Sequence, residues 1–395
     1  MAQPVRQNIA ELHPELSEKQ TYTLLIDGTN LLRLSFKDLR INSNGVHYGG
    51  VFQFLLQIKI LLQKKDFDYV YVFFDDEDSG ILRYQIYNGY KANRDKNYSY
   101  SIDDTSDYMK AYNAKLKSMQ NAIFNKEKKQ KELTDSEKFV KENFAREREI
   151  LMRYFNELYI RWIFDDKTEG DDLIAYYVKN KKPSDKVVIV SADEDLTQLI
   201  SNTVCIYNPR LKKFISDKNF KELKGYVYEN VVIKKIMCGD TSDNIGNIDG
   251  VSENRLFELI PEIKERPITI NEIKERALEK IQERKNEKKK PLKWHENIIN
   301  GVTKRNYDGD FYEINNKLIN LKMPLLTKEA KEEMDATMYV PMDTEGRSFT
   351  NLYKYILEDD ITDLKSNDRF SSFFSTFKSL SDKEVKRFND FMKKK

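Results

Sequence analysis

Short apolar runs rich in β-branched and aromatic residues recur along the chain, and two of them lead directly into aspartate. The runs at 22–26 (YTLLI), 69–74 (YVYVFF) and 187–190 (VVIV) have the length and composition of buried strands. Between them, the stretches at 50–63 and 171–179 have the pattern of helices. Strands that alternate with helices predict an α/β fold in which helices cover a mostly parallel sheet.

A long interval without glycine or proline follows the second run. It extends from Tyr90 through Glu169 and predicts a helical insertion. Its second half, about 136–162, carries apolar residues close to helical spacing, whereas its first half, about 95–132, is more polar. We therefore expect a long helix over the second half.

Beyond Ile260 the composition shifts to charged helix formers, including a Lys-rich run at 283–293. This region is expected to be mostly helical, and we find no repeat of fixed period in it. The chain then divides into three predicted parts. These are an N-terminal extension at 1–20, a covered-sheet domain at 21–235 and a helical region at 236–395.

The composition is that of a globular protein. With 395 residues, of which 39% are hydrophobic, the chain is long enough to bury a large core. No apolar run approaches the roughly 20 residues of a membrane span, and the N-terminal segment is too polar for a secretion signal. We therefore expect a cytoplasmic protein without a membrane partner. Cys205 and Cys238 lack the spacing of a metal-binding pair and are expected to be buried thiols.

Positive and negative charges are both abundant. The net charge of +2 results from 67 Lys and Arg against 65 Asp and Glu, so opposite charges are kept apart along the chain. An acidic pocket within a basic surface suits a polyanionic substrate.

Five short acidic motifs recur in chain order. They are IDGT around Asp27, FFDDED around Asp75, EGDD at 169–172, SADED at 191–195 and GDTSDN at 239–244. Most lie at or just beyond the end of an apolar run, where parallel strands bring their last side chains to one edge of a sheet. Carboxylates gathered there repel one another and raise each other's pKa, so the cluster is stable at neutral pH mainly with cations among them. Oxygen ligands without His or Cys favour Mg²⁺ or Mn²⁺.

Each motif taken alone has a simpler explanation. The step from Asp27 to glycine suits a turn, and an acidic residue such as Asp171 in the first turn of a helix complements the helix dipole. Asp193 and Asp195 fit such an explanation less well, because a helix cap needs only one of them. Two carboxylates two residues apart can reach one ion, or two ions roughly 4 Å apart, as in two-metal phosphoryl chemistry. The five motifs together favour a metal site that cleaves phosphodiesters.

The motifs and their order resemble those of the flap endonuclease and 5′-nuclease family. The matching segments are LLIDGTN (24–30), VFFDDED (72–78), YKANR (90–94), EGDDLIA (169–175), VSADEDLTQLI (190–200) and GDTSDNIGNIDGV (239–251). The resemblance covers roughly residues 22–260. Phage-encoded members are closest in size and in having a non-repetitive helical tail.

This resemblance implies a PIN-like sheet with two cation sites for Mg²⁺ or Mn²⁺ and a helical arch at about 95–150. The catalytic site would consist of Asp27, Asp75, Glu169, Asp171 and Asp193. The second site would consist of Asp172, Asp195, Asp240 and Asp243. Asp75 is preferred to Asp76 because the family pattern is an apolar run followed by Phe-Asp.

The same resemblance implies residues that hold nucleic acid at the base of the arch. Lys91 and Arg94 would position and polarise the scissile phosphate, and each can also meet a phosphate on physical grounds because a shared helix face presents both. Tyr90 is expected to stack on a terminal base. Arg33 is expected to reach a substrate phosphate.

Glycine turns after the last acidic motif suggest a helix-hairpin-helix element that grips duplex backbone, where the family often shares a monovalent cation. Gly246 and Gly250 would supply these turns. Ser252 and Glu253 replace the usual second glycine, which weakens the expectation of the cation. Arg255 and the Lys-rich run at 284–293 would compensate by direct contact with phosphate.

The function that follows is a divalent-metal-dependent 5′ to 3′ exonuclease and flap endonuclease, with RNase H-type primer removal, acting as a monomer on branched or 5′-ended duplex DNA and RNA/DNA. A sliding clamp or single-strand binding protein is an expected partner of the C-terminal region. The three histidines lie outside every motif, so a histidine general base is not expected. Two alternatives are a PIN-type processing RNase and a catalytically silent nucleic-acid-binding protein. The retained carboxylates argue against the second alternative.

Overall fold

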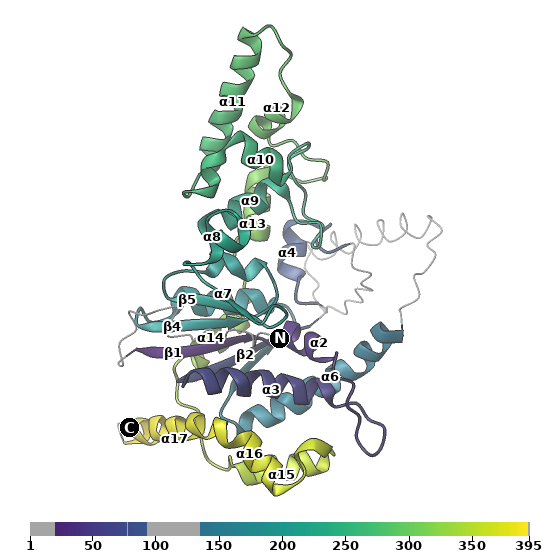
Figure 1. Ribbon diagram of the computed structural model, residues 1–395, viewed down its shortest axis with the longest axis vertical. Coiled ribbons are helices and arrows are strands. Elements are labelled where there is room, and N and C mark those ends of the chain that lie inside the picture. Colours follow the sequence, from purple (N-terminus) through teal and green to yellow (C-terminus); the bar gives the residue numbers. More distant parts are fainter. Residues whose placement is uncertain (1–19, 77, 93–134, 394–395) are drawn as a thin grey trace, which may run out of the picture.

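The computed structural model describes residues 20–76, 78–92 and 135–393. A six-stranded sheet lies at its centre, in the order β3-β2-β1-β4-β5-β6 (Figure 1). The strands are β1 (Thr21–Asp27), β2 (Tyr69–Asp75), β3 (Arg161–Asp165), β4 (Asp185–Val190), β5 (Val204–Asn208) and β6 (Lys213–Ile215). Every neighbouring pair is parallel except β5 and β6. The predicted mostly parallel sheet is therefore confirmed.

Strand β1 is apolar on both faces because both faces are covered. Leu24 and Ile26 belong to the core on one face, and Leu25 belongs to the core on the other. All three side chains are fully buried. A near-continuous apolar run is what a central parallel strand requires.

The first face of the sheet is covered from both ends of the chain. Its helices are α2 (Gly28–Ser35), α3 (Gly49–Lys64), α6 (Asp135–Glu157), α15 (Phe349–Glu358), α16 (Asn367–Phe374) and α17 (Lys378–Met392), with the 3-10 turns η4 (Thr362–Leu364) and η5 (Ser375–Phe377). The C-terminal helices thus share a core with β1 and β2.

The second face is covered by shorter elements. These are α7 (Gly170–Asn180), η1 (Asp195–Leu199), α8 (Phe220–Lys224), η2 (Tyr228–Asn230) and α14 (Lys328–Thr337). A third core lies beyond the sheet along the long axis of the molecule (Figure 1). It is formed by α4 (Ile81–Ile86), α9 (Val231–Cys238), α10 (Glu253–Leu259), η3 (Pro261–Lys264), α11 (Ile270–Asn286), α12 (Lys293–Asn300) and α13 (Phe311–Ile319).

The helix predicted to run to about residue 162 ends earlier, at Glu157. Tyr159 then adopts a positive φ of 56°, which the helix cannot continue. Arg161–Asp165 turns back as β3 and pairs with β2, so this part of the helical prediction is wrong. The absence of Gly and Pro concealed the boundary, because here a tyrosine makes the left-handed turn.

The predicted region 236–395 is helical in its described part, but its helices divide among three cores. Helices α10 to α13 pack in the third core, whereas α14 packs on the second face of the sheet and α15 to α17 pack on the first. The domain boundaries at 20 and 235 stay a prediction. Among the described residues, no helix combines the length and the apolar character needed to cross a membrane.

Candidate metal and nucleic-acid site

Four of the predicted ligands meet at the carboxyl end of the parallel strands. Asp27 ends β1, Asp75 ends β2, and Asp193 follows the end of β4. Asp171 lies in the first turn of α7. Because these strands are parallel neighbours or lie one strand apart, their ends open at one edge of the sheet.

Asp27 is fixed by hydrogen bonds on both of its carboxylate oxygens. Oδ1 accepts from the backbone N–H of Asn30 at 3.0 Å and caps α2, and Oδ2 accepts from the Ser191 hydroxyl at 2.8 Å. The Ser191 Oγ also accepts from the N–H of Asp193 at 2.9 Å. This serine therefore joins the end of β1 to the loop after β4.

The backbone around these strand ends is closely packed. A Cβ at Gly28 would lie 2.7 Å from the Phe74 ring, so only glycine fits after Asp27. The N–H of Gly170, at the start of α7, points to Asp75 Oδ2 at 3.4 Å. Strands β1 and β2 and helix α7 are thereby brought close together.

The four carboxyl groups interact electrostatically. Burial, followed by the charge of Asp75 and then of Asp193, raises the pKa of Asp27 to about 7, although hydrogen bonds from Asn30 and Ser191 oppose the rise. Burial and the charges of Asp193 and Asp27 also raise the pKa of Asp171. Burial together with neighbouring carboxylates, which raises the pKa of Asp27 and Asp171, is the environment that a bound cation stabilises.

The donor set suits a hard divalent cation. It consists only of carboxylate oxygens, which Mg²⁺ and Mn²⁺ prefer. Within residues 20–76, 78–92 and 135–393, no three His, Cys, Asp or Glu side chains already converge in a geometry that could hold a metal ion. A cation between these acidic side chains would relieve the repulsion between their charges.

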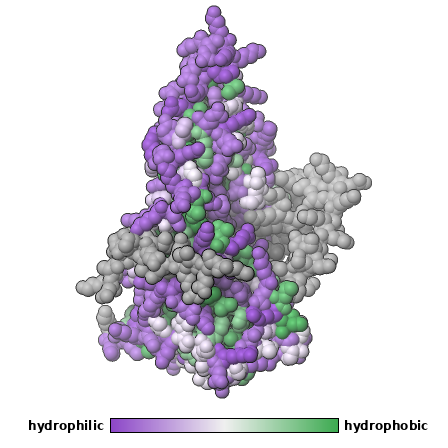
Figure 2. All heavy atoms as spheres, in the orientation of Figure 1, coloured by the Kyte–Doolittle hydropathy of each residue, from purple (hydrophilic) through white to green (hydrophobic). Residues whose placement is uncertain are grey.

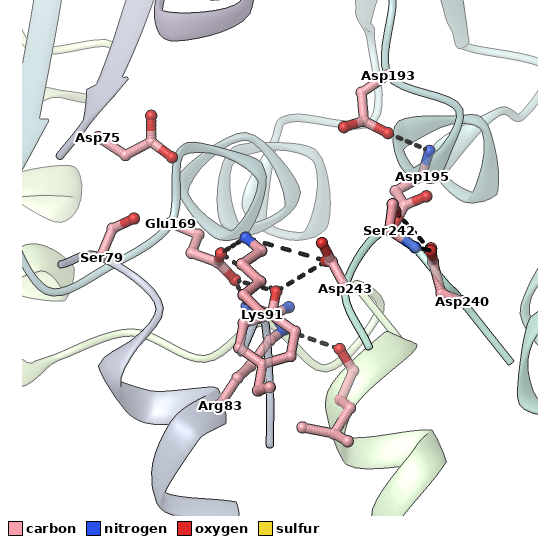
Figure 3. A network of polar contacts seen from close by, with 12 residues as sticks. Asp75, Ser79, Arg83, Lys91, Glu169, Asp193, Asp195, Asp240, Ser242 and Asp243 are labelled. Carbon is pink, nitrogen blue, oxygen red and sulfur yellow. Dashed lines mark hydrogen bonds and ion pairs between the residues drawn. The ribbon is translucent and has the colours of Figure 1, made fainter. Parts of the chain in front are cut away.

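Glu169 is held by cations of the protein (Figure 3). Its carboxylate pairs with Arg83 at 2.5 Å and with the ammonium of Lys91, and it accepts from the Tyr90 hydroxyl at 3.0 Å. Burial raises the pKa of Glu169, but Lys91 and Arg83 outweigh burial and lower the pKa to about 2. Glu169 is therefore ionised at neutral pH.

Asp172 does not lie with the second predicted metal site, which corrects that prediction. Its side chain is fully buried, pairs with Arg83 through two contacts, and accepts from the N–H of Leu325 at 2.9 Å. Arg83 also donates from Nε to the carbonyl oxygen of Leu318 at 2.8 Å. Asp172 thus joins α7 to α4 and the segment around α13, and its oxygens already have partners.

Two of the other predicted ligands of the second site lie on either side of a lysine. Lys235 of α9 pairs with Asp240 at 2.7 Å and also with Asp195. Burial raises the pKa of Asp240, but Lys235 outweighs burial and lowers the pKa to about 2, assisted by Ser242. Asp243 lies apart from this pair, beside Tyr90 and Lys91. A cation bound by Asp195 and Asp240 would have to displace the Lys235 ammonium.

The structure corrects the predicted stacking role of Tyr90. Only 3% of this residue is exposed, and its ring packs in the third core. Its hydroxyl contacts Glu169 and also Asp243, the latter at 3.1 Å. Lys91 follows with a positive φ of 53°, and its N–H donates to the Asp243 carbonyl at 2.8 Å. Tyr90 therefore holds the acidic side chains in place and offers no ring face to a base.

Arg33 and Arg94 are the other two predicted phosphate contacts. Arg33 lies in the last turn of α2 and is exposed, with its guanidinium 5.7 Å from the Phe144 ring of α6. Arg94 and residues 95–134 of the predicted arch lie outside the described residues. Both assignments stay predictions.

The predicted hairpin connects α9 to α10 through residues 239–252. Gly250 has a φ of 84°, which favours glycine. The side chain of Ser252 accepts from the N–H of Arg255 and caps α10, and Arg255 donates to the Gly250 carbonyl oxygen at 2.5 Å. Gly246 is buried, and its N–H donates to the Tyr307 hydroxyl at 2.8 Å. Phosphate contacts and the monovalent cation at this hairpin stay predictions.

Sequence reasoning missed Arg83, Ser191 and Lys235. Arg83 lies on a short helix without any motif of its own, and Lys235 is the second of two adjacent lysines in α9, with nothing in the sequence to distinguish it from Lys234. Only Ser191 carried a signal, because it opens the SADED motif directly after β4.

A comparison with known protein families now adds to this geometry. A family model described as the 5′-3′ exonuclease, N-terminal resolvase-like domain matches residues 22–225. The chain belongs to the 5′-3′ exonuclease family. All four carboxylates of the first group and the Lys91–Glu169 pair lie within the residues that match this exonuclease family.

Relatives of this exonuclease-family chain include longer proteins. DNA polymerase I of Bacillus subtilis (strain 168) is 25% identical over 268 residues, which cover 66% of this chain and 26% of that protein. A 5′-3′ exonuclease of Mycoplasmopsis pulmonis (strain UAB CTIP) is 35% identical over 97 residues, which cover 24% of this chain and 33% of that protein. The chain thus matches about a quarter to a third of the length of these relatives.

Solved structures of bacteriophage T5 proteins share the fold of this exonuclease-family chain. The T5 5′-exonuclease with bound divalent zinc ions has a TM-score of 0.52 at 15% identity, covering 91% of this chain and 99% of that chain. The T5 flap endonuclease in a pseudo-enzyme-product complex with DNA and metal ions has a TM-score of 0.51 at 15% identity, covering 92% and 99%. At this identity the likeness establishes the fold, and the PIN-like prediction is confirmed.

Proposed function

We propose that this chain is a divalent-metal-dependent, structure-specific 5′ nuclease that hydrolyses phosphodiesters in DNA replication or repair. The observation that carries the proposal is the group of four carboxylates at the strand ends, in which neighbouring charges raise the pKa of Asp27 and Asp171. Membership of the 5′-3′ exonuclease family supports the reaction class. Bound metal and DNA in the T5 neighbours are consistent with it.

The first group of carboxylates, Asp27, Asp75, Asp171 and Asp193, would hold the divalent cation. When bound, such cations supply an activated water and neutralise the charge that develops on the phosphate and the leaving oxygen. The Lys91 ammonium lies beside the ionised Glu169 and would add positive charge next to the scissile phosphate. Tyr90 keeps Glu169 in place through its hydroxyl.

The finer parts of the proposal concern the ions, substrate and setting. We propose two Mg²⁺ or Mn²⁺ ions, of which the second would replace Lys235 between Asp195 and Asp240. The substrates would be 5′ flaps and 5′ ends of duplex DNA or RNA/DNA hybrids, with RNase H-type removal of primers. The protein would act as a monomer in the cytoplasm, the host cytoplasm if it is phage-encoded, with a sliding clamp or single-strand binding protein as partner.

A labelled 5′-flap duplex in Mg²⁺ tests the activity. The wild type should cleave at the flap, and Asp171→Asn and Asp193→Asn should each lose at least about 100-fold in kcat, because each removes a charged ligand from the site. Asp382→Asn is the matched control, since this aspartate is exposed on α17 and away from the strand ends. Undiminished cleavage by both site variants would show that the metal site is wrongly assigned.

The same experiment separates the rival functions. Binding of the flap without cleavage by the wild type would favour a recruitment role. Cleavage of single-stranded RNA in preference to flaps would favour a processing RNase. A second substrate pair, an RNA primer on DNA against an all-DNA flap, measures the RNA preference.

A further inference from the structure

A two-helix arm extends from the hairpin to the far end of the molecule. It consists of α11, the segment 287–292 and α12, and the turn between the helices lies at the end of the long axis (Figure 1). Ile273 and Ala277 of α11 pack with Ile298 of α12 in the third core. A capping box of Thr269 and Glu272 starts α11. The arm is therefore a folded extension of that core.

The foot of the arm rests on the hairpin. Asn297 of α12 donates from Nδ2 to the Asp249 carbonyl oxygen at 2.9 Å, and the N–H of Asp249 donates to the Val302 carbonyl oxygen at 2.8 Å. The Arg255 guanidinium lies 5.9 Å from the ring centre of Trp294. A ligand lying on the hairpin would therefore meet the arm next.

The tip of the arm is the most basic stretch of the chain's described part. Residues 280–290 contain six Lys and Arg against two Glu, an excess of four positive charges, although the whole chain carries only +2. The rest of the chain is therefore net negative. In Figure 2 this end of the molecule is predominantly hydrophilic.

Several tip lysines are unpaired with acids. Lys285, Lys288 and Lys290 are exposed, and none has an ion pair with a carboxylate among the described residues, whereas Lys280 and Lys289 pair with the two glutamates of the tip. Farther down α11 the pattern differs, because Arg276 pairs with Glu262 and Glu279. On an ordinary solvated helix face, basic side chains have acidic neighbours, as Arg276 does. The tip differs from such a face because several of its lysines have no acidic partner.

Just after the end of α11, a lysine lies at a backbone position where glycine is usual. Helix α11 ends with the N–H of Lys288 bonded to the Lys285 carbonyl oxygen and the N–H of Lys289 bonded to the Arg284 carbonyl oxygen. In this ending the residue at the left-handed position is usually glycine, but here it is Lys288, with a φ of 58°. Lysine occupies a position at which glycine would fit better.

The composition of the tip selects among nucleic-acid ligands. Binding of single strands relies on aromatic rings that stack on bases, but residues 280–290 contain no aromatic residue. Lysine ammonium groups instead match phosphates as point charges. The tip therefore suits the regular backbone of a duplex.

We propose that the lysine tip of this arm binds the phosphate backbone of double-stranded nucleic acid beyond the hairpin and lengthens the duplex that the protein covers. This proposal rests on the proposed function and names a second contact region for its duplex. The 17 residues of α11 span about 25 Å at the helical rise, and phosphates along one strand are about 3.4 Å apart. The tip would therefore reach about seven base pairs beyond the foot of the arm.

Binding of blunt duplexes of increasing length in EDTA, followed by fluorescence anisotropy, tests the proposal without requiring cleavage. The test variant combines Lys288→Gly with Lys285→Gln and Lys290→Gln. For long duplexes it should bind roughly tenfold or more weakly than the wild type, and log K should depend less steeply on log salt, by about 0.9 for each phosphate that the variant no longer binds. Duplexes that are shorter by about seven base pairs do not reach the tip, so the variant and the wild type should bind them with equal affinity.

The control variant removes the same charge elsewhere, through Lys331→Gln, Lys378→Gln and Lys386→Gln on α14 and α17. It should bind long duplexes like the wild type. Lys288→Gly alone should unfold at the same or a higher temperature than the wild type, so weaker binding by this variant cannot come from misfolding.

The proposal is overturned if the tip variant binds long duplexes as tightly as the wild type, if it is weakened equally at every length, or if the control is weakened as much. Loss of binding to vesicles with anionic lipids in place of duplex would also overturn it. Failure of the proposed nuclease is recognised separately, by wild-type protein that binds duplex with this length dependence but does not cleave a flap in Mg²⁺.

Discussion

At the scale of single residues, two kinds of acid lie in the candidate site. Glu169 and Asp240 lie against lysines, and each has its pKa lowered to about 2. Asp27 and Asp171 lie against other acids, and their pKa values are raised. Lysines of the protein already neutralise the first kind. A bound cation would therefore be stabilised most beside the second kind, at Asp27 and Asp171.

The thermal stability of Asp171→Asn should reveal this unrelieved repulsion. In EDTA above neutral pH, the variant should melt above the wild type, since about 1 kcal/mol of relieved repulsion shifts Tm by roughly 2–4 °C. Adding Mg²⁺ should raise the Tm of the wild type but much less that of the variant. Calorimetry with Asp382→Asn as control measures both effects, and a variant that melts below the wild type in EDTA would contradict the assignment.

Tyr90→Phe separates a hydroxyl role from a stacking role. The variant keeps the ring and removes the hydroxyl next to Glu169 and Asp243. Because hydrogen bonds to charged groups contribute about 1.5–3 kcal/mol, the free energy of unfolding in urea should fall by that amount. Tyr207→Phe is the control, since this tyrosine is also buried and the described residues provide no partner for its hydroxyl. An unchanged free energy of unfolding for Tyr90→Phe would contradict the role of this hydroxyl in holding Glu169 and Asp243.

At the scale of elements, the start of α3 is capped from another helix. Its own N-cap residue, Tyr48, makes no side-chain cap. Glu147 of α6 instead accepts from the N–H of Val51 at 2.8 Å and contacts His47 Nδ1 at 2.5 Å. A buried carboxylate at a helix start complements the exposed N–H groups, so this pair ties α6 to α3.

The His47–Glu147 pair should make stability depend on pH. Burial lowers the pKa of His47, but Glu147 outweighs burial and raises it above the ordinary 6.5. The folded chain then holds the proton more tightly than the unfolded chain, so the stabilisation is complete below about 6.5 and is lost as pH rises through the folded pKa.

His47→Gln should therefore lower the free energy of unfolding most in acid. The difference from the wild type should shrink as pH rises above the folded pKa of His47. Urea unfolding of both proteins across this pH range measures it, and comparing the two cancels all other titrating groups. A difference that grows toward alkaline pH would contradict the sign.

At the scale of the whole molecule, the sequence predicted features that depend on a single segment, such as a strand and the aspartate after it. It did not predict contacts between elements that are distant along the chain. Asp27, Asp75 and Asp193 follow apolar runs, so parallel strands had to place them at one edge. The pairing of Lys235 with Asp195 joins α9 to η1, and no spacing along the chain encodes it. Strand β3 was missed for the same reason, since pairing with β2 decides its conformation.

The C-terminal helices provide the strongest test of how the whole chain folds. Phe374 and Phe377 are almost fully buried against the sheet, in a core shared with β1, α3 and α6. Phe374→Ala should lower the free energy of unfolding by about 3–5 kcal/mol, because a large buried ring leaves a cavity. Met392→Ala, which removes a side chain that is 53% exposed, should change it by less than about 0.5 kcal/mol.

The two tryptophans show which part of the molecule loses that stability. Trp162 packs on the core that contains Phe374, whereas Trp294 packs in the third core near the hairpin. In proteins that keep only one of the two, with the other changed to phenylalanine, Phe374→Ala should lower the unfolding midpoint reported by Trp162. An equal shift at Trp294 would mean that both cores unfold as one unit. A shift at Trp294 alone would contradict the packing, because the end of the chain would then stabilise the hairpin core and not the sheet that carries the carboxylates.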